Sequence, residues 1–354
     1  MARVMIAAGG TGGHVYPALA VACWLRDRGH QVYWMGGPDG LEQRVVPAAG
    51  FPVDTVAVRG LRGKGVGRLL QAPFMLSRAL WQAGRILRRR RPQVMLGMGG
   101  FVAGPGGWLA RWLGIPLVIH EQNRVAGTTN RWLAPHARRV LEGFPQTFAA
   151  TLKPCWTGNP LRREIAALRP KAGRSGPPRL LVLGGSQGAE VLNDTVPRAL
   201  AGMSGRLEVW HQCGAGRQAD VARRYRESGF APVRVDDFIE DMAAAWQWAD
   251  LAVCRAGAMT ISELAAAGVV AVLVPFPHAI DDHQRRNAEY LVEKGGAVLL
   301  PQSRLSPAAL RQTIEDLIYD REKLGRMGMS ARQAARLDAT ETVARICLEV
   351  ADGA

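Results

Sequence analysis

Three glycine-rich turns in the sequence have the composition of phosphate-binding loops. They span residues 9–13, 97–107 and 184–188, and an apolar run precedes each of them. Glycine permits positive φ and close backbone approach, and the amides that open a following helix attract anions. None of the three matches the P-loop pattern or a clean dinucleotide fingerprint. Tight packing of a helix on a sheet would explain one such turn, whereas three in one chain favour phosphate binding.

His14 directly follows the first of these turns. A histidine at a helix start beside a ligand site can remove a proton from a hydroxyl group, which is the role of a general base. It can equally well pack or hydrogen-bond locally, and spacing alone leaves both open. Glu121 and Asn123 follow another apolar run, so all three polar groups are expected at strand ends, where open α/β sheets bind ligands. His14 is the preferred base and Glu121 is the alternative, although linear order does not separate them.

Glu263 is a candidate ligand for a ribose. The sequence predicts a helix over residues 261–267, with Glu263 near its start. A carboxylate there can accept hydrogen bonds from both hydroxyls of a ribose, as the acidic residue of dinucleotide folds does. A glutamate that only complements the helix dipole is the alternative.

The elements that must position these residues are short apolar strands alternating with longer helical segments. Continuous apolar strands are typical of parallel sheets that helices cover on both faces. A helix start is predicted at Ser306-Pro307, where an N-cap residue precedes a proline. The expected strands span residues 4–8, 31–35, 94–98, 117–120, 180–183, 207–211, 251–254 and 269–274.

The chain divides into two similar halves, because a glycine-rich turn follows the first strand of each. We expect one domain over residues 1–157 and a second over residues 158–334, with a turn at Gly158 between them. Residues 335–354 have helical periodicity and are expected to return to the first domain. The predicted fold class is therefore α/β, with two Rossmann-like domains.

Composition limits the class of protein. The 354 residues suffice for two domains, and 48% of them are hydrophobic. No apolar run reaches 18 residues and the N-terminal run is too short for a signal peptide, so neither a membrane span nor a leader is expected. Five scattered cysteines without a CxxC pair indicate reduced thiols in the cytosol. No His/Cys cluster has zinc spacing, so no metal is expected.

The net charge of +15 lies almost wholly in the first half. Residues 1–157 hold 20 Lys and Arg against 6 Asp and Glu, and residues 158–354 hold 25 against 24. Such asymmetry points to a polyanionic partner, either nucleic acid or an anionic membrane. An arginine-rich genome would raise both halves alike. No helix-turn-helix, zinc-finger or RNP signature accompanies the basic stretch, so nucleic acid is not expected.

Residues 55–120 contain no acidic residue and alternate cations with apolar side chains. An apolar set bordered by cations suits a surface that rests on an anionic bilayer. A core helix with solvated arginines is the alternative. The cations are Arg59, Arg62, Lys64, Arg68, Arg78, Arg85, Arg88 to Arg91 and Arg111, and the apolar residues are Val66, Leu69, Leu70, Phe74, Met75, Leu76, Leu80, Trp81, Ile86 and Leu87.

These motifs together resemble the MurG family of glycosyltransferases. The resemblance runs in motif order from about residue 3 to residue 350, and its most specific parts are residues 120–123 and 255–263. It implies the GT-B fold, in which two Rossmann-like domains face each other across a cleft. It also implies inverting, metal-independent transfer of N-acetylglucosamine from UDP-N-acetylglucosamine to lipid I, undecaprenyl-diphospho-muramoyl-pentapeptide, which forms lipid II for peptidoglycan synthesis. No cofactor is implied, and the expected location is the cytoplasmic face of the cell membrane, as a peripheral protein.

The resemblance also implies roles for individual residues. Catalysis falls to His14 and Glu121, and the acceptor is expected to contact His14, Phe101, Glu121 and Asn123. Phe101 stands where some relatives have tyrosine, so a phenolic hydroxyl is not essential there. The residues implied for the donor are Thr11, Gly12, Gly13, Asn123, Arg162, Ser186, Gln187, Gly188, Ile239, Arg255, Ala258, Met259, Thr260, Glu263 and Gln284.

A nucleotide-sugar 2-epimerase on the same fold is the alternative function. It would bind the same UDP-sugar but would take no lipid acceptor. The basic first half and its apolar residues favour the transferase.

Overall fold

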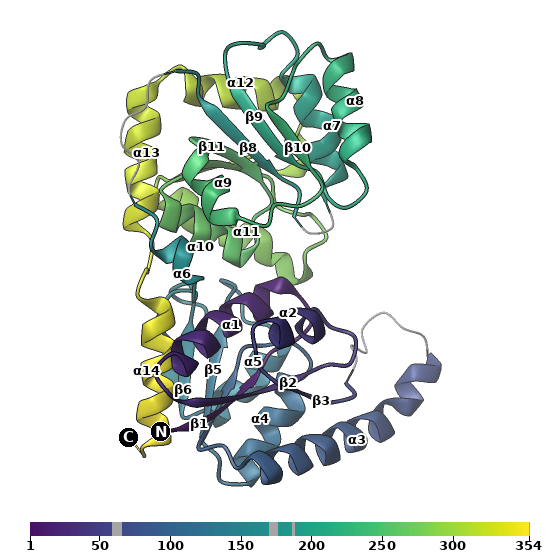
Figure 1. Ribbon diagram of the computed structural model, residues 1–354, viewed down its shortest axis with the longest axis vertical. Coiled ribbons are helices and arrows are strands. Elements are labelled where there is room, and N and C mark those ends of the chain that lie inside the picture. The colour runs from purple at the N-terminus through teal and green to yellow at the C-terminus, as the bar shows by residue number, and fades with distance from the viewer. Residues whose placement is uncertain (59–65, 170–175, 186–187, 354) are drawn as a thin grey trace. The chain divides into compact units, whose positions relative to one another are not determined.

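The structure is a computed structural model that describes residues 1–58, 66–169, 176–185 and 188–353, with all of their side chains except those of residues 66–72 and 280. The chain forms two compact units, shown in Figure 1. The first comprises Met1–Arg162 and Leu337–Ala354, and the second comprises Arg163–Arg336. Each unit is built on a parallel β-sheet, which confirms the predicted fold class.

The sheet of the first unit has seven described strands in the order β3-β2-β1-β4-β5-β6-β7. The four strands predicted from apolar runs are β1, β2, β4 and β5, each within one residue of its expected bounds. Of the other three, β3 and β7 have only three and two residues, and β6 has a charged residue at each end, so none of them contains an apolar run. The bounds are β1 Arg3–Ala7, β2 Gln31–Gly36, β3 Val53–Thr55, β4 Val94–Gly97, β5 Leu117–Glu121, β6 Arg139–Glu142 and β7 Cys155–Trp156.

Helices cover both faces of this sheet. Val4 and Ile6 of β1 belong to one apolar cluster with α1 and α14, and Met5 and Ala7 belong to another with α3 and α4. Burial on both faces explains why the strands are apolar throughout. The helices are α1 Gly12–Arg26, α2 Glu42–Ala48, α3 Val66–Arg90, α4 Ala103–Trp112, α5 Thr128–Leu133 and α14 Ala339–Ala351, with short 3-10 turns at Ala134–His136 and Ala150–Leu152.

The last helix, α14, packs against α1 although more than 300 residues separate them in the chain. Its buried side chains Val343, Cys347 and Val350 lie in the same cluster as Val15 and Val21 of α1. The apolar stripe on α14 therefore completes one face of the first unit. Figure 1 shows α14 beside α1.

The sheet of the second unit has six described strands in the order β10-β9-β8-β11-β12-β13, all parallel. The four predicted strands are β8, β9, β11 and β12, again within one residue. The strand bounds are β8 Arg179–Leu183, β9 Glu208–Gln212, β10 Arg234–Asp236, β11 Leu251–Cys254, β12 Val270–Leu273 and β13 Ala297–Leu299.

The predicted helix start at Ser306-Pro307 is confirmed, because the Ser306 hydroxyl accepts a hydrogen bond from the Ala309 amide at 3.1 Å. The helices of the second unit are α6 Arg163–Ala166, α7 Glu190–Ala199, α8 Gln218–Glu227, α9 Met242–Trp248, α10 Ala258–Ala267, α11 His283–Glu293, α12 Pro307–Ile318 and α13 Arg321–Gln333, with 3-10 turns at Ile280–Asp282 and Gln302–Arg304.

The prediction that places Glu263 at a helix start is wrong. Helix α10 begins at Ala258, three residues earlier than expected, after an extended N-cap residue, Gly257, with ψ of 146°. Alanine and methionine favour helix, so the helix continues back to the glycine. Glu263 therefore lies in the second turn of α10, beyond the first-turn amides that a dipole-complementing acid would neighbour.

Candidate active site

His14 occupies the first turn of α1, directly after the glycine-rich turn that ends β1. Its Nδ1 lies 3.4 Å from the Thr11 hydroxyl. On its other side the imidazole lies beside Gly99, where an added Cβ would come within 3.0 Å of the His14 Nε2. The half-buried ring is therefore held between two turns at the carboxyl ends of β1 and β4, as expected for a ligand-facing residue.

The turn between β4 and α4 packs directly on the first glycine-rich turn. A Cβ on Gly100 would lie 2.5 Å from the Gly9 carbonyl oxygen, so only glycine permits this approach. Phe101 follows and is 56% exposed. Residues 97–107 therefore include a turn that supports the first one and presents an aromatic ring beside it.

Glu121 ends β5 and is only 2% exposed. Its Oε1 accepts hydrogen bonds from the amide and the side-chain Nδ2 of Asn123, at 3.0 and 3.1 Å. Its Oε2 accepts from the Gly127 amide at 3.0 Å and from the Asn130 Nδ2 at 2.9 Å. Four donors to one buried carboxylate fix the loop between β5 and α5.

His120 is fully buried beneath this loop. Its Nε2 lies 2.9 Å from the Gly158 carbonyl oxygen and its Nδ1 lies 3.0 Å from the Gln122 Nε2. Burial lowers the pKa of His120 to about 4, so the ring is neutral near pH 7. This histidine ties the loop to residue 158 and is too buried to act on a substrate.

Arg162, expected in the second domain, lies in the first unit. The segment before it stays bonded to the first sheet, because the Thr157 amide donates to the Glu142 carbonyl and the Asn159 Nδ2 donates to the Gln122 carbonyl. The Arg162 guanidinium lies 5.8 Å from the centre of the Tyr16 ring on α1. It therefore neighbours the helix that carries His14.

The glycine-rich turn of the second unit is held by Gln212, a buried residue at the end of β9. The Gln212 Oε1 accepts from the Gly185 amide at 3.0 Å, and its Nε2 donates to the carbonyls of Gly185 and Asp237 at 3.0 and 2.8 Å. Ser186 and Gln187 lie outside the described residues. Gly188 closes the turn with φ of 73°.

Glu263 projects from α10 towards the buried indole of Trp246 on α9. The indole Nε1 donates to the Glu263 Oε2 at 2.9 Å. Because Trp246 is fully buried, it gives the carboxylate a fixed orientation. Ile239, one of the residues implied for the donor, is buried in the loop between β10 and α9.

Gln284 and Arg255 lie around the segment that follows β12. The Gln284 Oε1 accepts from the amides of Ala256 and Phe276, at 3.3 and 2.9 Å, which fixes the orientation of the side-chain amide. The Arg255 guanidinium donates to the carbonyls of Val274 and Pro275, and burial lowers the pKa of Arg255. Arg255 thus orders the end of β12.

The first turn of α10 contains Ala258, Met259 and Thr260 and no acidic side chain. Its amides, together with the helix dipole, form a favourable environment for a phosphate group.

Within the described ranges, no helix is both long and apolar enough to span a membrane. The same part of the chain holds no group of three His, Cys, Asp or Glu side chains arranged to bind a metal ion.

Two family models match the chain. The glycosyltransferase family 28 N-terminal domain matches residues 4–142, and the C-terminal domain of the same family matches residues 179–343. The chain belongs to glycosyltransferase family 28. This membership makes it a glycosyltransferase.

Relatives of known name are similar to this family 28 chain along its whole length. A UDP-N-acetylglucosamine--N-acetylmuramyl-(pentapeptide) pyrophosphoryl-undecaprenol N-acetylglucosamine transferase from Methylococcus capsulatus is 56% identical over 354 residues, which covers 99% of both chains. A protein of the same name from Nitrosococcus oceani is 54% identical over 357 residues, with the same coverage. The resemblance drawn from the motifs is therefore confirmed.

Solved structures agree with this family 28 assignment. MurG from Acinetobacter baumannii superimposes with a TM-score of 0.84 at 40% identity, over 99% of this chain and 100% of that one. The calicheamicin glycosyltransferase CalG4 reaches a TM-score of 0.66 at 19% identity, over 99% of this chain and 98% of that one, which shows a common fold. The predicted GT-B fold is confirmed.

Three residues near the site were missed by sequence reasoning: Glu42, Gln212 and Trp246. Glu42 follows a fourth glycine-rich turn, residues 36–40, after β2, and this turn was the available signal. Gln212 and Trp246 act through contacts with residues 27 and 17 positions away, which no local pattern reveals.

Proposed function

We propose that this glycosyltransferase transfers N-acetylglucosamine from UDP-N-acetylglucosamine to lipid I, forming lipid II. The observation that carries the proposal is the 56% identity, over 99% of both chains, with a transferase of that name. Members of one family with this identity along the whole chain share their reaction far more often than proteins that share only a fold. The 2-epimerase alternative is not favoured by these relatives.

The reaction is a single displacement. An oxygen of the acceptor hydroxyl attacks the anomeric carbon of N-acetylglucosamine, and the bond from that carbon to the β-phosphate oxygen breaks. The electron pair leaves with UDP, and the hydroxyl proton passes to a base on the protein. Because the nucleophile enters opposite to the leaving group, the anomeric configuration inverts.

His14 is the base that the geometry supports. Its ring is half-buried and borders two turns at the carboxyl ends of the strands. Glu121, the other candidate, is 2% exposed, and each of its two carboxylate oxygens already accepts two hydrogen bonds. We therefore assign to Glu121 the role of holding the loop that carries Asn123, and to Phe101 and Asn123 contacts with the acceptor.

Each proposed donor contact in the second unit matches one chemical group of UDP-N-acetylglucosamine. The amides that open α10 suit the diphosphate, the Glu263 carboxylate suits the ribose diol, and the Gln284 Nε2 suits a sugar hydroxyl. The backbone of Ile239 is assigned to the uracil. The remaining residues assigned to the donor are Thr11, Gly12, Gly13, Asn123, Arg162, Ser186, Gln187, Gly188, Arg255, Ala258, Met259 and Thr260.

Release of UDP tests this function. The protein is incubated with UDP-N-acetylglucosamine in the presence and absence of a lipid I analogue with a shortened polyprenyl chain. UDP release that requires the analogue supports the transferase. Conversion of the UDP-sugar to another sugar without any acceptor would instead support the epimerase.

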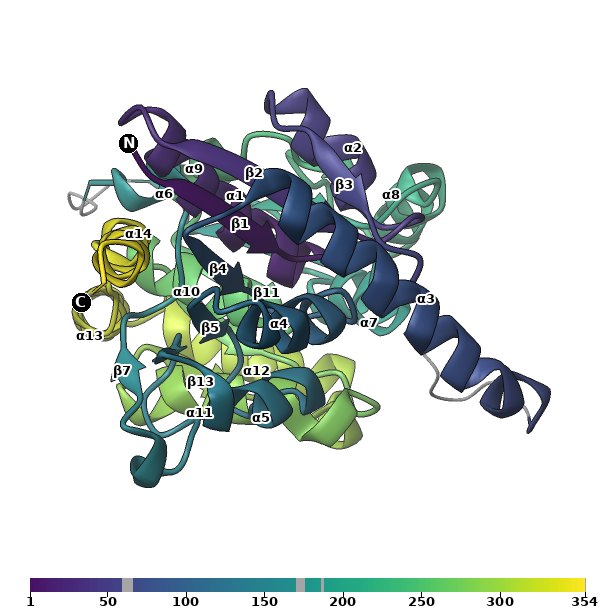
Figure 2. The same cartoon turned by 90° about the horizontal axis from the view of Figure 1, so that it is seen from below.

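We further propose that the first unit binds the cytoplasmic face of an anionic membrane through an aromatic and cationic surface on α3, α4 and α5. Figure 2 shows α3 and α4, which pack against each other. Exposed aromatic side chains lie on all three helices, and exposed arginines accompany them. The aromatic residues are Phe74, Trp81, Trp108, Trp112 and Trp132, and the arginines are Arg78, Arg85, Arg88, Arg111 and Arg131.

A groove of about 410 Å³ runs along this surface, with Trp81 and Arg85 among its lining residues. The Arg85 guanidinium lies 5.7 Å from the centre of the Trp81 ring, which pairs a cation with an amphipathic ring as membrane interfaces favour. Part of the expected apolar set faces inward, because Ile86 and Leu87 are buried in the core. Residues 59–65, and the side chains of residues 66–72, lie outside the described part of the chain.

Vesicle sedimentation tests the membrane proposal. Each arginine near an anionic surface contributes about 1 kcal/mol, so the double variant Arg78→Glu, Arg85→Glu is expected to lose binding to anionic vesicles. The matched control carries the same charge change on exposed arginines of the second unit, Arg226→Glu and Arg304→Glu, and is expected to bind. Equal sedimentation of the two variants, or sedimentation with neutral vesicles, would contradict an electrostatic anchor.

A further inference from the structure

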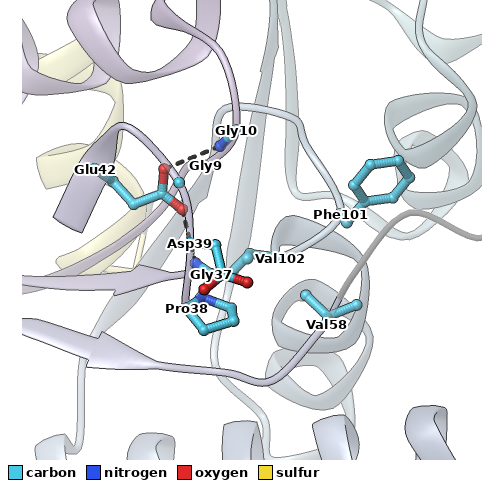
Figure 3. Close-up of a pocket in the computed structure, with 10 residues that line it drawn as sticks. Gly9, Gly10, Gly37, Pro38, Asp39, Glu42, Val58, Phe101 and Val102 are labelled. Atoms are coloured by element: carbon cyan, nitrogen blue, oxygen red, sulfur yellow. Dashed lines mark hydrogen bonds between the residues drawn. The ribbon is translucent and has the colours of Figure 1, made fainter.

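A pocket of about 380 Å³ lies in the first unit at the carboxyl ends of β1 to β4. Four turns contribute to its lining, including the first glycine-rich turn and the turn that follows β2 (Figure 3). Its lining residues are Gly9, Gly10, Gly37, Pro38, Asp39, Gly40, Glu42, Val58, Phe101 and Val102. The glycine composition alone would suggest a phosphate site.

A carboxylate of the protein already occupies the anion position of this pocket. Glu42 is 1% exposed, its Oε2 accepts a hydrogen bond from the Gly10 amide at 3.0 Å, and its Oε1 accepts from the Gly37 amide at 2.8 Å. Figure 3 shows the carboxylate joining the two turns. The Gly10 amide, which a phosphate would otherwise use, is therefore committed to an internal anion.

The glycines around Glu42 leave room for this carboxylate. A Cβ on Gly9 would lie 2.5 Å from the Glu42 Oε1, and a Cβ on Gly40 would overlap its Oε2. The turns thus contain glycine because a carboxylate fills the space beside them. A second anion in this pocket would meet a like charge at short range and would be repelled.

The opposite wall of the pocket is apolar. Val58 and Val102 line it, and the half-exposed ring of Phe101 lies on the side away from Glu42 in Figure 3. An aromatic face packs against the C–H face of a sugar ring, whereas the buried charge of Glu42 disfavours a phosphate group. A wall that carries a buried negative charge and a wall that carries an aromatic ring together suit an uncharged N-acetylated sugar.

We propose that this pocket takes the N-acetylmuramyl sugar of the acceptor and excludes its pyrophosphate, and that Glu42 determines this choice. The proposal rests on the proposed function, since it concerns the same acceptor. The pocket shares the Gly9–Gly10 and Gly99–Phe101 turns with His14, so a sugar bound there has its hydroxyls close to the proposed base.

Competition with the acceptor tests the proposal. The transfer reaction is measured against increasing acceptor in the presence of N-acetylmuramyl-pentapeptide without a pyrophosphoryl group, or of inorganic pyrophosphate. Phe101→Ala is expected to raise the inhibition constant of the sugar-peptide by about 10-fold, because it removes the aromatic wall. Glu42→Gln is expected to lower the inhibition constant of pyrophosphate by about 10-fold, because it removes the charge that repels a second anion. Neither variant is expected to weaken inhibition by pyrophosphate.

The control variant is Glu142→Gln. Glu142 is also buried in the first unit and accepts the amides of Gln146, Thr147 and Phe148, but it does not line the pocket. It is expected to leave both inhibition constants unchanged. Unchanged or weaker pyrophosphate inhibition in Glu42→Gln, or unchanged sugar-peptide inhibition in Phe101→Ala, would overturn the proposal. Absence of any transfer by the wild-type protein would instead contradict the proposed function.

Discussion

Replacement of Glu263 separates a binding role from a structural one. The carboxylate lies in the second turn of α10, and its Oε2 accepts the indole hydrogen bond of Trp246 at 2.9 Å. Glu263→Gln keeps an oxygen for the indole and removes the charge. Glu263→Ala removes both, and it leaves the donor group of a fully buried tryptophan without its partner.

The two variants are therefore expected to differ in stability and to agree in donor binding. A hydrogen bond to a charged group contributes about 1.5–3 kcal/mol, so loss of the ribose contact should weaken donor binding about 10- to 100-fold in both variants. The unsatisfied Trp246 donor should cost a further 1–3 kcal/mol or so of unfolding free energy in Glu263→Ala alone. Glu263→Gln should unfold close to wild type.

Titration calorimetry with UDP-N-acetylglucosamine and urea unfolding measure these two quantities. Glu315→Gln, which alters a half-exposed ion pair with Arg311 on α12, serves as the control and should retain donor affinity. Donor affinity within twofold of wild type in both Glu263 variants would refute the assignment of this carboxylate to the ribose.

Two other predictions concern histidines. His14→Ala should lower the turnover number about 10²- to 10⁴-fold with little change in donor affinity, because a general base acts in the transition state; turnover near wild type would exclude His14 as the base. Burial lowers the pKa of His120 to about 4 and the pKa of His211 to about 3, from 6.5. Below about pH 6.5 these histidines therefore bind protons in the unfolded state but stay neutral in the folded state. Stability should therefore be full above pH 6.5 and should fall by up to about 1.4 kcal/mol per pH unit for each histidine as the pH drops towards 4. Urea unfolding at about pH 7 and about pH 5 checks this, and equal stabilities would contradict it.

The sequence predicted those strands that consist of a continuous run of apolar residues. The eight apolar runs form eight strands whose residues are almost all buried, so both faces of each strand favour apolar side chains. Strands such as β3 and β7, at the edges of the first sheet, have three and two residues, too few for a periodic pattern. The start of α10 was misplaced because a glycine N-cap gives a weaker signal than the Ser306 that opens α12.

The chemistry of the site was less predictable than its position. Glu121 has the residue type of a base, but its carboxylate accepts hydrogen bonds from Gly127 and Asn130, which follow it in the chain. Glu42 likewise becomes an internal anion only when the turns after β1 and β2 are brought together. Residue type and spacing identify polar groups at strand ends, whereas their hydrogen-bond partners depend on tertiary structure.

The most direct test of the central claim is to identify the product. The protein, UDP-N-acetylglucosamine and a short-chain lipid I analogue are incubated together, and the lipid product is analysed by mass spectrometry and by NMR of the new glycosidic bond. We expect the analogue to gain one N-acetylhexosamine residue with inverted anomeric configuration, and an equal amount of UDP to appear. An unmodified analogue in the presence of a wild-type protein that binds the donor would contradict the proposed function.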